Sequence, residues 1–278
     1  MSSILTNHSA MTALSTLRMI NSNLAETQGR ISTGLSISSG KDNAAYFSIS
    51  KTMAGDSGMF KAIDENLTLQ KNAVSTARLG AETLVDLAQD FAERVAFAQG
   101  GTQEVRDDIQ AELDELVARM QTTIDQSTFN GADYVNNTVA VTVVTGISRS
   151  SAGSISTTTM SFFQQDLGAI QAALDAVSIT SATTAVAQAT ALQTAEAQLS
   201  AAVAAATAFG IAEKSIETQK EFLGALTDRL DSGIGSMVDA NMEEEAARLQ
   251  ALQVQQQLAT QSLSIANAAP QNILSLFR

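Results

Sequence analysis

The sequence predicts a mainly α-helical protein: long antiparallel helices, a coiled coil formed by the two ends of the chain, and one or two small β-hairpins in the middle. Three observations predict this fold class. Apolar residues recur at three- and four-residue spacing over long stretches, which is typical of helices packed in pairs. The 278 residues are 45% hydrophobic but only 4% aromatic, with a single proline, so little breaks a helix. β-branched residues form a run only in the centre.

The first helix is expected from about residue 7 to residue 31, and a connector of small residues without periodicity follows it. Its predicted apolar seam consists of Ala10, Leu14, Leu17, Leu24 and Ile31. A much longer helix is expected from about residue 54 to residue 99, because its 3–4 register continues until Gly100-Gly101 stops it. Thr102 is then a plausible cap for a third helix.

The centre of the chain has a different pattern. Val139–Thr145 and Ile155–Phe163 are predicted strands of a hairpin region at about 132–165, with a turn between them. Helix resumes at about 166–177, and an alanine-rich helix is expected from about residue 186 to residue 230. Ser232–Gly235 is expected to interrupt it, and Asn241 with Glu244 three residues later resembles a capping box for the last helix.

The last helix carries two apolar stripes. One consists of Leu249, Leu252, Ala259 and Leu263, and the other of Val254, Leu258 and Ile265. Two stripes require two partners. One partner is the first helix of the same chain, and the other is the last helix of a neighbouring molecule. The predicted self-association surface comprises Leu14, Leu17, Leu24, Ile31, Leu249, Leu252, Leu258, Leu263 and Ile265.

Composition argues against several classes of partner. The formal net charge of −13 disfavours nucleic acid, which binds to positive surfaces, and equally disfavours anionic membranes. We find no run of the roughly 20 apolar residues that a membrane span needs, and no cleavable secretory signal. The chain contains no cysteine, so disulfide and thiol chemistry are excluded.

No residue pattern indicates an enzyme, a cofactor site or a metal site. His8 is the single histidine and has no evident catalytic partner. We interpret the acidic residues between Asp107 and Glu115 as a solvated helix face, and Glu243-Glu244-Glu245 as charge that favours a helix start. Gly233-Ile234-Gly235 lacks the strand and the third glycine of a dinucleotide loop. The Ser/Thr-rich stretch from Ser148 to Ser161 is interpreted as an exposed hairpin, with O-glycosylation as the alternative.

The two ends of the chain resemble bacterial flagellin. The matching segments cover about the first 135 and the last 90 residues, in the order of that family. They include Ile31-Ser32-Thr33-Gly34-Leu35, Lys41-Asp42-Asn43-Ala44-Ala45, Phe129-Asn130-Gly131, Val238-Asp239-Ala240-Asn241-Met242 and the ending Pro270-Gln271-Asn272-Ile273-Leu274-Ser275-Leu276-Phe277-Arg278. Tyr46 departs from the glycine of the family motif. Only about fifty residues separate the two halves, so the resemblance implies a short form without large outer domains.

The resemblance implies a structural subunit that self-polymerises into the extracellular flagellar filament, either alone or together with other flagellins. Residues 1–35 and 243–278 would form a terminal coiled coil that lines the inner tube. Residues 36–53 and 232–242 would be connectors, and residues 54–231 a rod of long helices. The resemblance further implies type III export, an export chaperone at the C-terminal segment, and contacts with the filament cap and hook-junction proteins.

Two other functions remain open at this point. A hook–filament junction protein has related termini. Growth into a long polymer would distinguish a filament subunit from such a junction protein. A regulatory coiled-coil adaptor would instead form a stable small oligomer, and it leaves the second stripe of the last helix unexplained.

Overall fold

The computed structural model describes residues 7–150 and 153–276. It confirms the fold class, because the described chain is mostly helical and contains one two-stranded antiparallel sheet. The chain divides into two compact units. We call residues 1–57 and 228–278 the terminal unit, and residues 58–227 the central unit. Helices α2 and α5 each contribute to both.

Helix α1 (His8–Thr33) begins and ends with well-defined caps. The side chain of Asn7 accepts a hydrogen bond from the backbone N–H of Ala10 at 3.1 Å. At the other end Gly34 has φ 72°, a left-handed conformation that glycine adopts without a steric penalty, and its N–H bonds to the carbonyl of Arg30. In α6 (Met242–Leu276), the Asn241 side chain accepts from the N–H groups of Glu243 and Glu244, so Asn241 caps this helix.

Helix α2 (Ala44–Ala98) begins ten residues earlier than predicted, so the expected connector at 36–53 is shorter than the sequence indicated. The start signal is Asn43, whose side-chain oxygen accepts hydrogen bonds from the N–H groups of Ala45 and Tyr46 at 3.1 and 3.2 Å. An asparagine in a run of small polar residues is inconspicuous in the sequence, yet it is a strong helix cap.

Helix α5 (Ala185–Val238) continues through the segment 232–235, where we expected a break. Glycine lowers helix propensity but does not forbid a helix. Here the two glycines make room for side chains: a Cβ at Gly233 would lie 3.2 Å from Met53 Cε, and one at Gly235 would lie 2.7 Å from an oxygen of Asp239. The connector therefore spans only the residues between Val238 and Met242.

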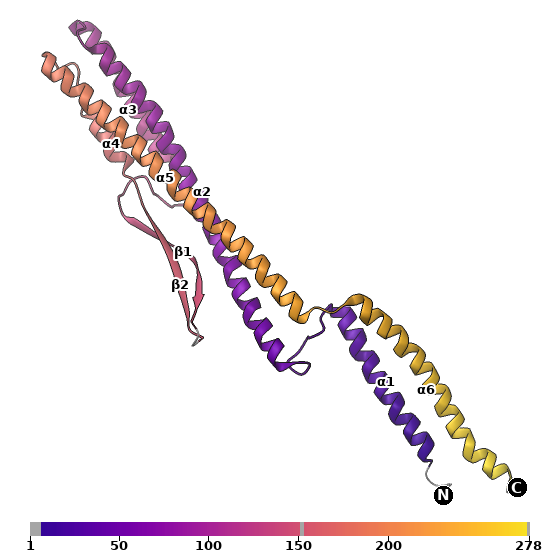
Figure 1. Cartoon of the computed structure of the whole chain (residues 1–278). Helices are drawn as coiled ribbons and strands as arrows, with labels where there is room; N and C mark the ends of the chain where they lie inside the picture. Colours follow the sequence, from indigo (N-terminus) through magenta and orange to yellow (C-terminus); the bar gives the residue numbers. More distant parts are fainter. Residues whose placement is uncertain (1–6, 151–152, 277–278) are drawn as a thin grey trace. The chain divides into compact units, whose positions relative to one another are not determined.

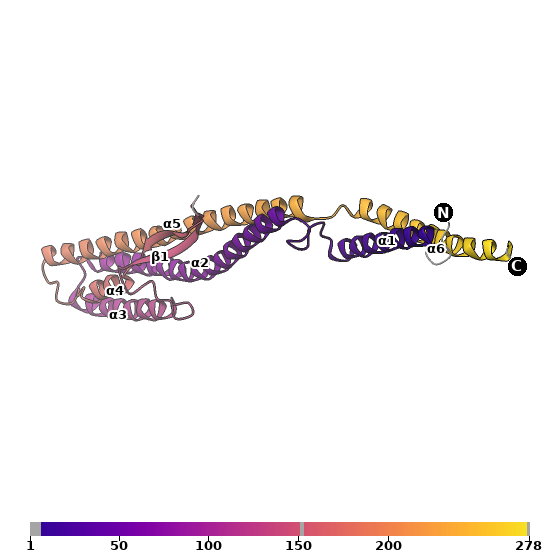
Figure 2. The same ribbon diagram turned by 90° about the horizontal axis from the view of Figure 1, so that it is seen from below.

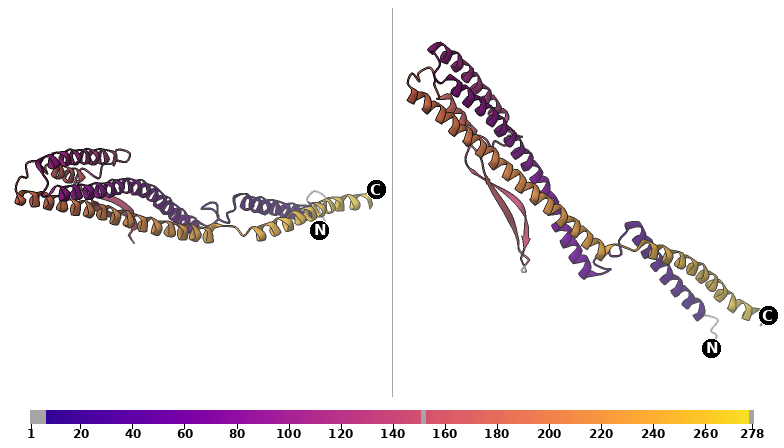
Figure 3. Two further views of the ribbon diagram at one scale, coloured as in Figure 1. Left: turned by 90° about the horizontal axis from the view of Figure 1, so that it is seen from above. Right: turned by 45° about the horizontal axis from the view of Figure 1, so that its top comes forward.

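In the central unit, α2 and α5 run side by side, and α3 (Gln103–Gln126) packs back along α2 (Figures 2 and 3). Ion pairs join α2 to α5 along this contact: Lys71 with Glu217 at 3.0 Å, and Arg78 with Glu213 at 2.7 Å. The core is mainly aliphatic, and its buried aromatic residues include Phe60, Phe91, Phe162 and Phe209. Its fully or almost fully buried members include Leu67, Val74, Leu84, Phe91, Leu113, Met120, Ile124, Ala195, Ala202, Phe209, Ile216 and Leu223.

The predicted hairpin is present as β1 (Ala140–Arg149) and β2 (Ile155–Phe163), which pair antiparallel with an irregularity between Val144 and Gly146. Gln219 of α5 donates a hydrogen bond to the carbonyl of Thr145 at this irregularity, which holds the hairpin against the helices. The short helix α4 (Leu167–Asp175) follows, capped by the side chain of Asp166.

One helix meets the length and composition criteria for a membrane span. By this measure an 18-residue stretch of α5 is apolar enough on average, although it is not the run of roughly 20 apolar residues that the sequence prediction found to be absent. Alanine satisfies the measure without any continuous run of large apolar residues. A core helix of a globular protein satisfies it as well, and α5 buries Ala195, Ala202 and Phe209 within the central unit.

The terminal helix pair as a candidate self-association surface

Helices α1 and α6 pack against each other as an antiparallel pair (Figure 1). Three direct polar contacts between described residues join them along their length, and one of these is the ion pair of Arg30 with Glu245 at 3.2 Å. The Asn7 side-chain N–H donates to the carbonyl of Ala266 at 2.7 Å, and the Gln256 amide donates to Asn21 at 2.7 Å. Pro270 has no N–H to offer the carbonyl four residues before it. That carbonyl belongs to Ala266, so Asn7 supplies the hydrogen bond that the helix lacks.

The contact between the two helices follows one seam on each. On α1 the least exposed positions recur at three- and four-residue spacing: Ala10, Ala13, Leu17, Ile20, Leu24, Thr27 and Ile31. On α6 the corresponding positions are Glu245, Leu249, Leu252, Gln256, Ala259, Leu263 and Ala266. Both series are complete heptad patterns, which is the arrangement of a coiled-coil interface.

The structure brings six of the nine predicted surface residues onto this seam: Leu17, Leu24, Ile31, Leu249, Leu252 and Leu263. Leu14 does not belong to it. Its side chain is 37% exposed and lies at the edge, whereas Ala13 and Ile20 occupy seam positions. The sequence pattern favoured the larger apolar side chain over the alanine beside it.

The other two of the nine, Leu258 and Ile265, lie on the far side of α6 with Val254 of the second predicted stripe. Val254, Leu258 and Ile265 are 55%, 61% and 67% exposed. At about 100° per residue, they lie about 150° around the helix from the seam. Ala247 and Ala251 continue the same line, and we call these five residues the outer stripe. It leaves large apolar side chains in contact with solvent in the single chain.

Helix α6 has no charged residue from Leu249 to Leu276. Its third face carries uncharged polar residues such as Gln253, Gln257 and Ser264, all exposed. Several copies of this helix can therefore lie close together without repulsion between like charges.

The connection between the terminal helices and the rest of the terminal unit is also ordered. Ser36 N–H donates to the carbonyl of Val238 at 2.7 Å, and Ala240 N–H donates to the carbonyl of Gly34 at 2.8 Å. Next to it, one oxygen of Asp42 accepts hydrogen bonds from the backbone N–H and the hydroxyl of both Ser38 and Ser39. The backbone N–H groups of Ser39 and Ser38 lower the pKa of the Asp42 carboxyl below its usual value.

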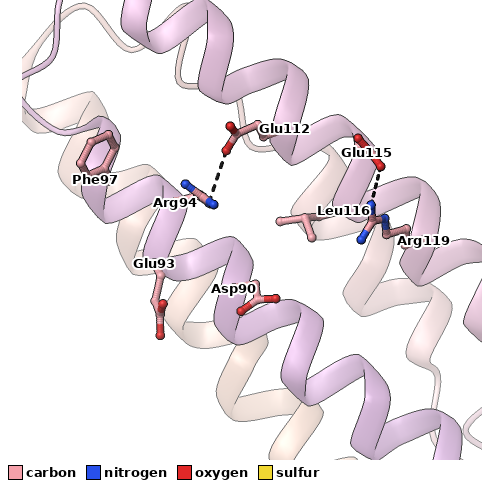
Figure 4. Close-up of a pocket in the computed structure, with 8 residues that line it drawn as sticks. All are labelled: Asp90, Glu93, Arg94, Phe97, Glu112, Glu115, Leu116 and Arg119. Atoms are coloured by element: carbon pink, nitrogen blue, oxygen red, sulfur yellow. Dashed lines mark hydrogen bonds and ion pairs between the residues drawn. The ribbon is translucent and has the colours of Figure 1, made fainter.

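A groove in the central unit does not resemble a catalytic site. It has a volume of about 600 Å³ and lies between α2 and α3 (Figure 4). Arg94 pairs across it with Glu112 at 3.3 Å, and Arg119 pairs along α3 with Glu115 at 2.5 Å. Exposed carboxylates and guanidinium groups line it, without a nucleophile or a histidine. Among the described residues, no group of three His, Cys, Asp or Glu could hold a metal ion.

Comparisons with known proteins agree with this architecture. The family model of the bacterial flagellin N-terminal helical region matches residues 4–140, and that of the C-terminal helical region matches residues 190–277. A flagellin of Brucella melitensis is 39% identical, with 100% of both chains covered. Flagellin C of Rhizobium meliloti is 32% identical with the same coverage, and flagellin FljM of Caulobacter vibrioides is 31% identical over 100% of this chain and 99% of its own.

A solved structure, that of Bacillus cereus flagellin, is 15% identical and covers 66% of this chain and 94% of its own. Its TM-score of 0.35 is too low to support an argument about shape. The two family matches and the full-length relatives show that the chain belongs to the bacterial flagellin family, and that it is a short form of the structural subunit of the flagellar filament.

Proposed function

We propose that this flagellin polymerises by burying the outer stripe of α6 between neighbouring subunits, after α1 has covered the seam. The observation that carries the proposal is the exposure of Val254, Leu258 and Ile265 on a helix whose other apolar line is already covered. Complete burial of one large aliphatic side chain contributes about 1.5–3 kcal/mol. Three such side chains in each subunit, repeated in every copy, favour a polymer over the separate chain.

The domain assignment that we propose follows from this role. Residues 1–35 and 243–278 form the inner coiled-coil layer. Because α2 begins at Ala44 and α5 ends at Val238, the connectors shorten from the predicted 36–53 and 232–242 to about 36–43 and 239–241, and residues 44–238 form the outer layer. Support comes from the difference in charge along the chain. Between Leu249 and Leu276 there is no charge, whereas the central helices carry many acidic residues that require access to water.

We also propose that the chain is exported unfolded through the type III apparatus and assembles outside the cell beneath the filament cap, distal to the hook-junction proteins. Before export, an exposed apolar stripe at the C-terminal end is a target for aggregation. An export chaperone that binds this segment would cover it. The family is a structural one, and we propose no catalytic activity for the chain.

The alternative is a hook–filament junction protein. Such a protein would use the same helix pair but stop after a short assembly, whereas a filament subunit continues to grow. The relatives named above are all flagellins, which favours the filament subunit.

Seeded polymerisation, followed by electron microscopy, tests the proposal. The full chain should form long tubes, and a chain that lacks residues 1–35 and 243–278 should stay monomeric but helical. Replacing both Leu258 and Ile265 by Gln should abolish growth while the helix content stays unchanged. The matched control replaces Gln257 and Ser264 by Ala on the polar face. Long tubes from the Leu258 and Ile265 variant would refute the outer stripe, and small discrete oligomers from the full chain would refute the filament subunit.

A further inference from the structure

Glu245 occupies a position that is otherwise apolar or uncharged. Of the seam positions on α1 and α6, it is the one with an ionisable side chain. Its side chain is only 7% exposed. One carboxylate oxygen accepts hydrogen bonds from Arg30 of α1 at 3.2 Å and from Arg248 of its own helix at 3.4 Å. The other oxygen is buried and makes no hydrogen bond.

This environment is a poor source of stability. A buried carboxylate loses its hydration, and an ion pair regains that free energy only if the remaining lone pairs are also satisfied. Here one oxygen of Glu245 is not satisfied. An apolar residue at the same position would cost less in isolation. The position therefore calls for a reason other than the strength of the helix pair.

The rest of the seam defines its own alignment weakly. A slide of α6 along α1 by one heptad, about 10 Å, replaces each seam residue by the residue seven positions away. Leu252 is then replaced by Ala259, and Leu249 by Gln256. On α1, Leu17, Leu24 and Ile31 are already equivalent positions of successive heptads. The apolar residues of α1 therefore hardly distinguish the observed alignment from one shifted by a heptad, and discrimination must come from residues of α6.

The charge of Glu245 distinguishes the observed alignment from the alignments shifted by one heptad. In the observed alignment the contacts pair residue 7 with 266, 21 with 256 and 30 with 245. A one-heptad slide in one direction places Glu245 opposite Asn23, close to the like charge of Glu26. The opposite slide places it past the end of α1, opposite Ile37. Either slide takes the carboxylate away from Arg30 and leaves it with Arg248 of its own helix alone, which is unfavourable wherever the carboxylate stays buried. A slide also breaks the backbone hydrogen bonds that join Gly34 and Ser36 to Ala240 and Val238.

We propose that Glu245, held by Arg30, fixes the register of the terminal helix pair and thereby positions the outer stripe for polymerisation. A single polar or charged residue on a coiled-coil seam is known to specify register at a cost in stability. The proposal rests on the proposed function, because the register matters only if the outer stripes of neighbouring copies must meet. It assigns Glu245 the role of a positioning residue.

The test uses the full-length chain and its lack of cysteine. A pair of introduced cysteines, Asn21→Cys with Gln256→Cys, reports the observed register through a short thiol-reactive cross-linker. Gln28→Cys with Gln256→Cys and Leu14→Cys with Gln256→Cys report slides of one heptad in either direction. Each pair is combined with Glu245→Met, which removes the charge and keeps the bulk. The matched control is Glu244→Met, an exposed neighbour in the same helical turn that also pairs with Arg248.

With Glu245→Met we expect the ratio of out-of-register to in-register cross-links to rise at least about tenfold, which corresponds to about 1.4 kcal/mol of lost discrimination. Helicity and melting temperature should stay equal or increase, and long filaments should be lost. Arg30→Met should change the ratio in the same direction. Glu244→Met should leave both the ratio and the filaments unchanged.

An unchanged cross-link ratio in Glu245→Met overturns the inference, whatever happens to the filaments. A fall in melting temperature with an unchanged register likewise overturns it, because Glu245 would then be an ordinary stabilising residue. The proposed function fails separately. It fails if the parent chain with glutamate at position 245 does not grow into filaments, while the cross-link ratio can still be measured in that chain.

Discussion

At the scale of single residues, the structure depends on a few polar groups and glycines in places where the hydrophobic pattern carries no information. Asn7 caps α1 and also supplies the hydrogen bond that Pro270 removes from α6. Asp42 gathers four hydrogen bonds on one oxygen in the segment before α2. Gly80 permits close contact between α2 and the end of α3. Asp42 and Gly80 each give a testable prediction.

Asp42 should make the segment before α2 sensitive to acid. Its pKa is lowered in the folded chain by the N–H groups of Ser39 and Ser38, so folding favours the charged form. The stabilisation is present above the pKa of the unfolded carboxyl and is lost as the pH falls through the folded pKa. We expect Asp42→Asn to increase proteolysis near Lys41 at neutral pH, and the difference from the parent chain to disappear on acidification. A difference that is independent of pH would contradict this account.

Gly80→Ala should destabilise the central unit. A Cβ at this position would lie 1.9 Å from the hydroxyl oxygen and 2.6 Å from the Cβ of Ser127, so the two helices must move apart. Overpacking of this kind costs about 1–3 kcal/mol in the free energy of unfolding, measured by denaturant titration. The control is Gly58→Ala on the same helix, where a Cβ meets nothing within 4 Å. This control should stabilise the chain slightly through higher helix propensity. Equal effects at the two sites would exclude the steric explanation.

At the scale of elements, periodicity predicted every helix and the hairpin, because long apolar repeats are visible without any tertiary information. The positions predicted for the ends of the helices were less accurate. Asn43 starts α2 within a run that resembled a connector, and Gly233 and Gly235 stay helical because neighbouring side chains need the space. Whether a glycine breaks a helix or admits a close contact depends on residues far away in the sequence, which a local pattern does not show.

The candidate surface was predicted in the same uneven way. Most large aliphatic residues of both stripes were found, but Ile20 was missed because the pattern selected Leu14 in the turn before it. Ala13, Thr27 and Gln256 were missed because they are small or polar. Glu245 was interpreted as part of an acidic helix start, a role that its place in the first turn also supports. Counting seven residues back from Leu252 leads to Glu245, so strict heptad spacing was the signal that could have identified it.

Leu263→Asp tests the seam as an element. Leu263 is partly buried between α6 and α1, and a charge there has no partner. We expect the central unit to remain folded and filament formation to be lost, because an unpaired charge in this place costs several kcal/mol. Circular dichroism and electron microscopy measure the two effects. Ser264→Asp, on the exposed polar face, is the matched control for added charge, and normal filaments from Leu263→Asp would show that the seam is dispensable.

At the scale of the whole molecule, charge is distributed very unevenly. Of the 29 acidic and 16 basic residues, 20 and 9 lie between Gly58 and Thr227, which gives the central unit a formal net charge of −11. The terminal unit carries the remaining −2. In the assembly that we propose, copies packed in a polymer would therefore repel one another mainly through their central units, and their ends would attract through apolar contact.

Polymerisation should consequently become faster as salt is added. Raising NaCl from about 0.02 M to about 0.2 M shortens the screening length from roughly 20 Å to less than 10 Å, which weakens repulsion between neighbouring central units. We expect the rate of seeded elongation, followed by light scattering, to increase several-fold over this range. Sucrose at equal osmolarity is the control. A rate that decreases with salt would indicate that attraction between opposite charges dominates the contact.

The pairing of the first helix with the last also has a consequence for synthesis. The contacts between them join residues separated by 215 to 259 positions, so this part of the fold has very high contact order and cannot form until the C-terminal end of the chain is available. A chain that ends prematurely, before α6, leaves α1 without its partner and has no outer stripe. If the outer stripe is the contact between subunits, as we propose, only a complete polypeptide can join the polymer, and truncated products of translation are excluded because they lack α6.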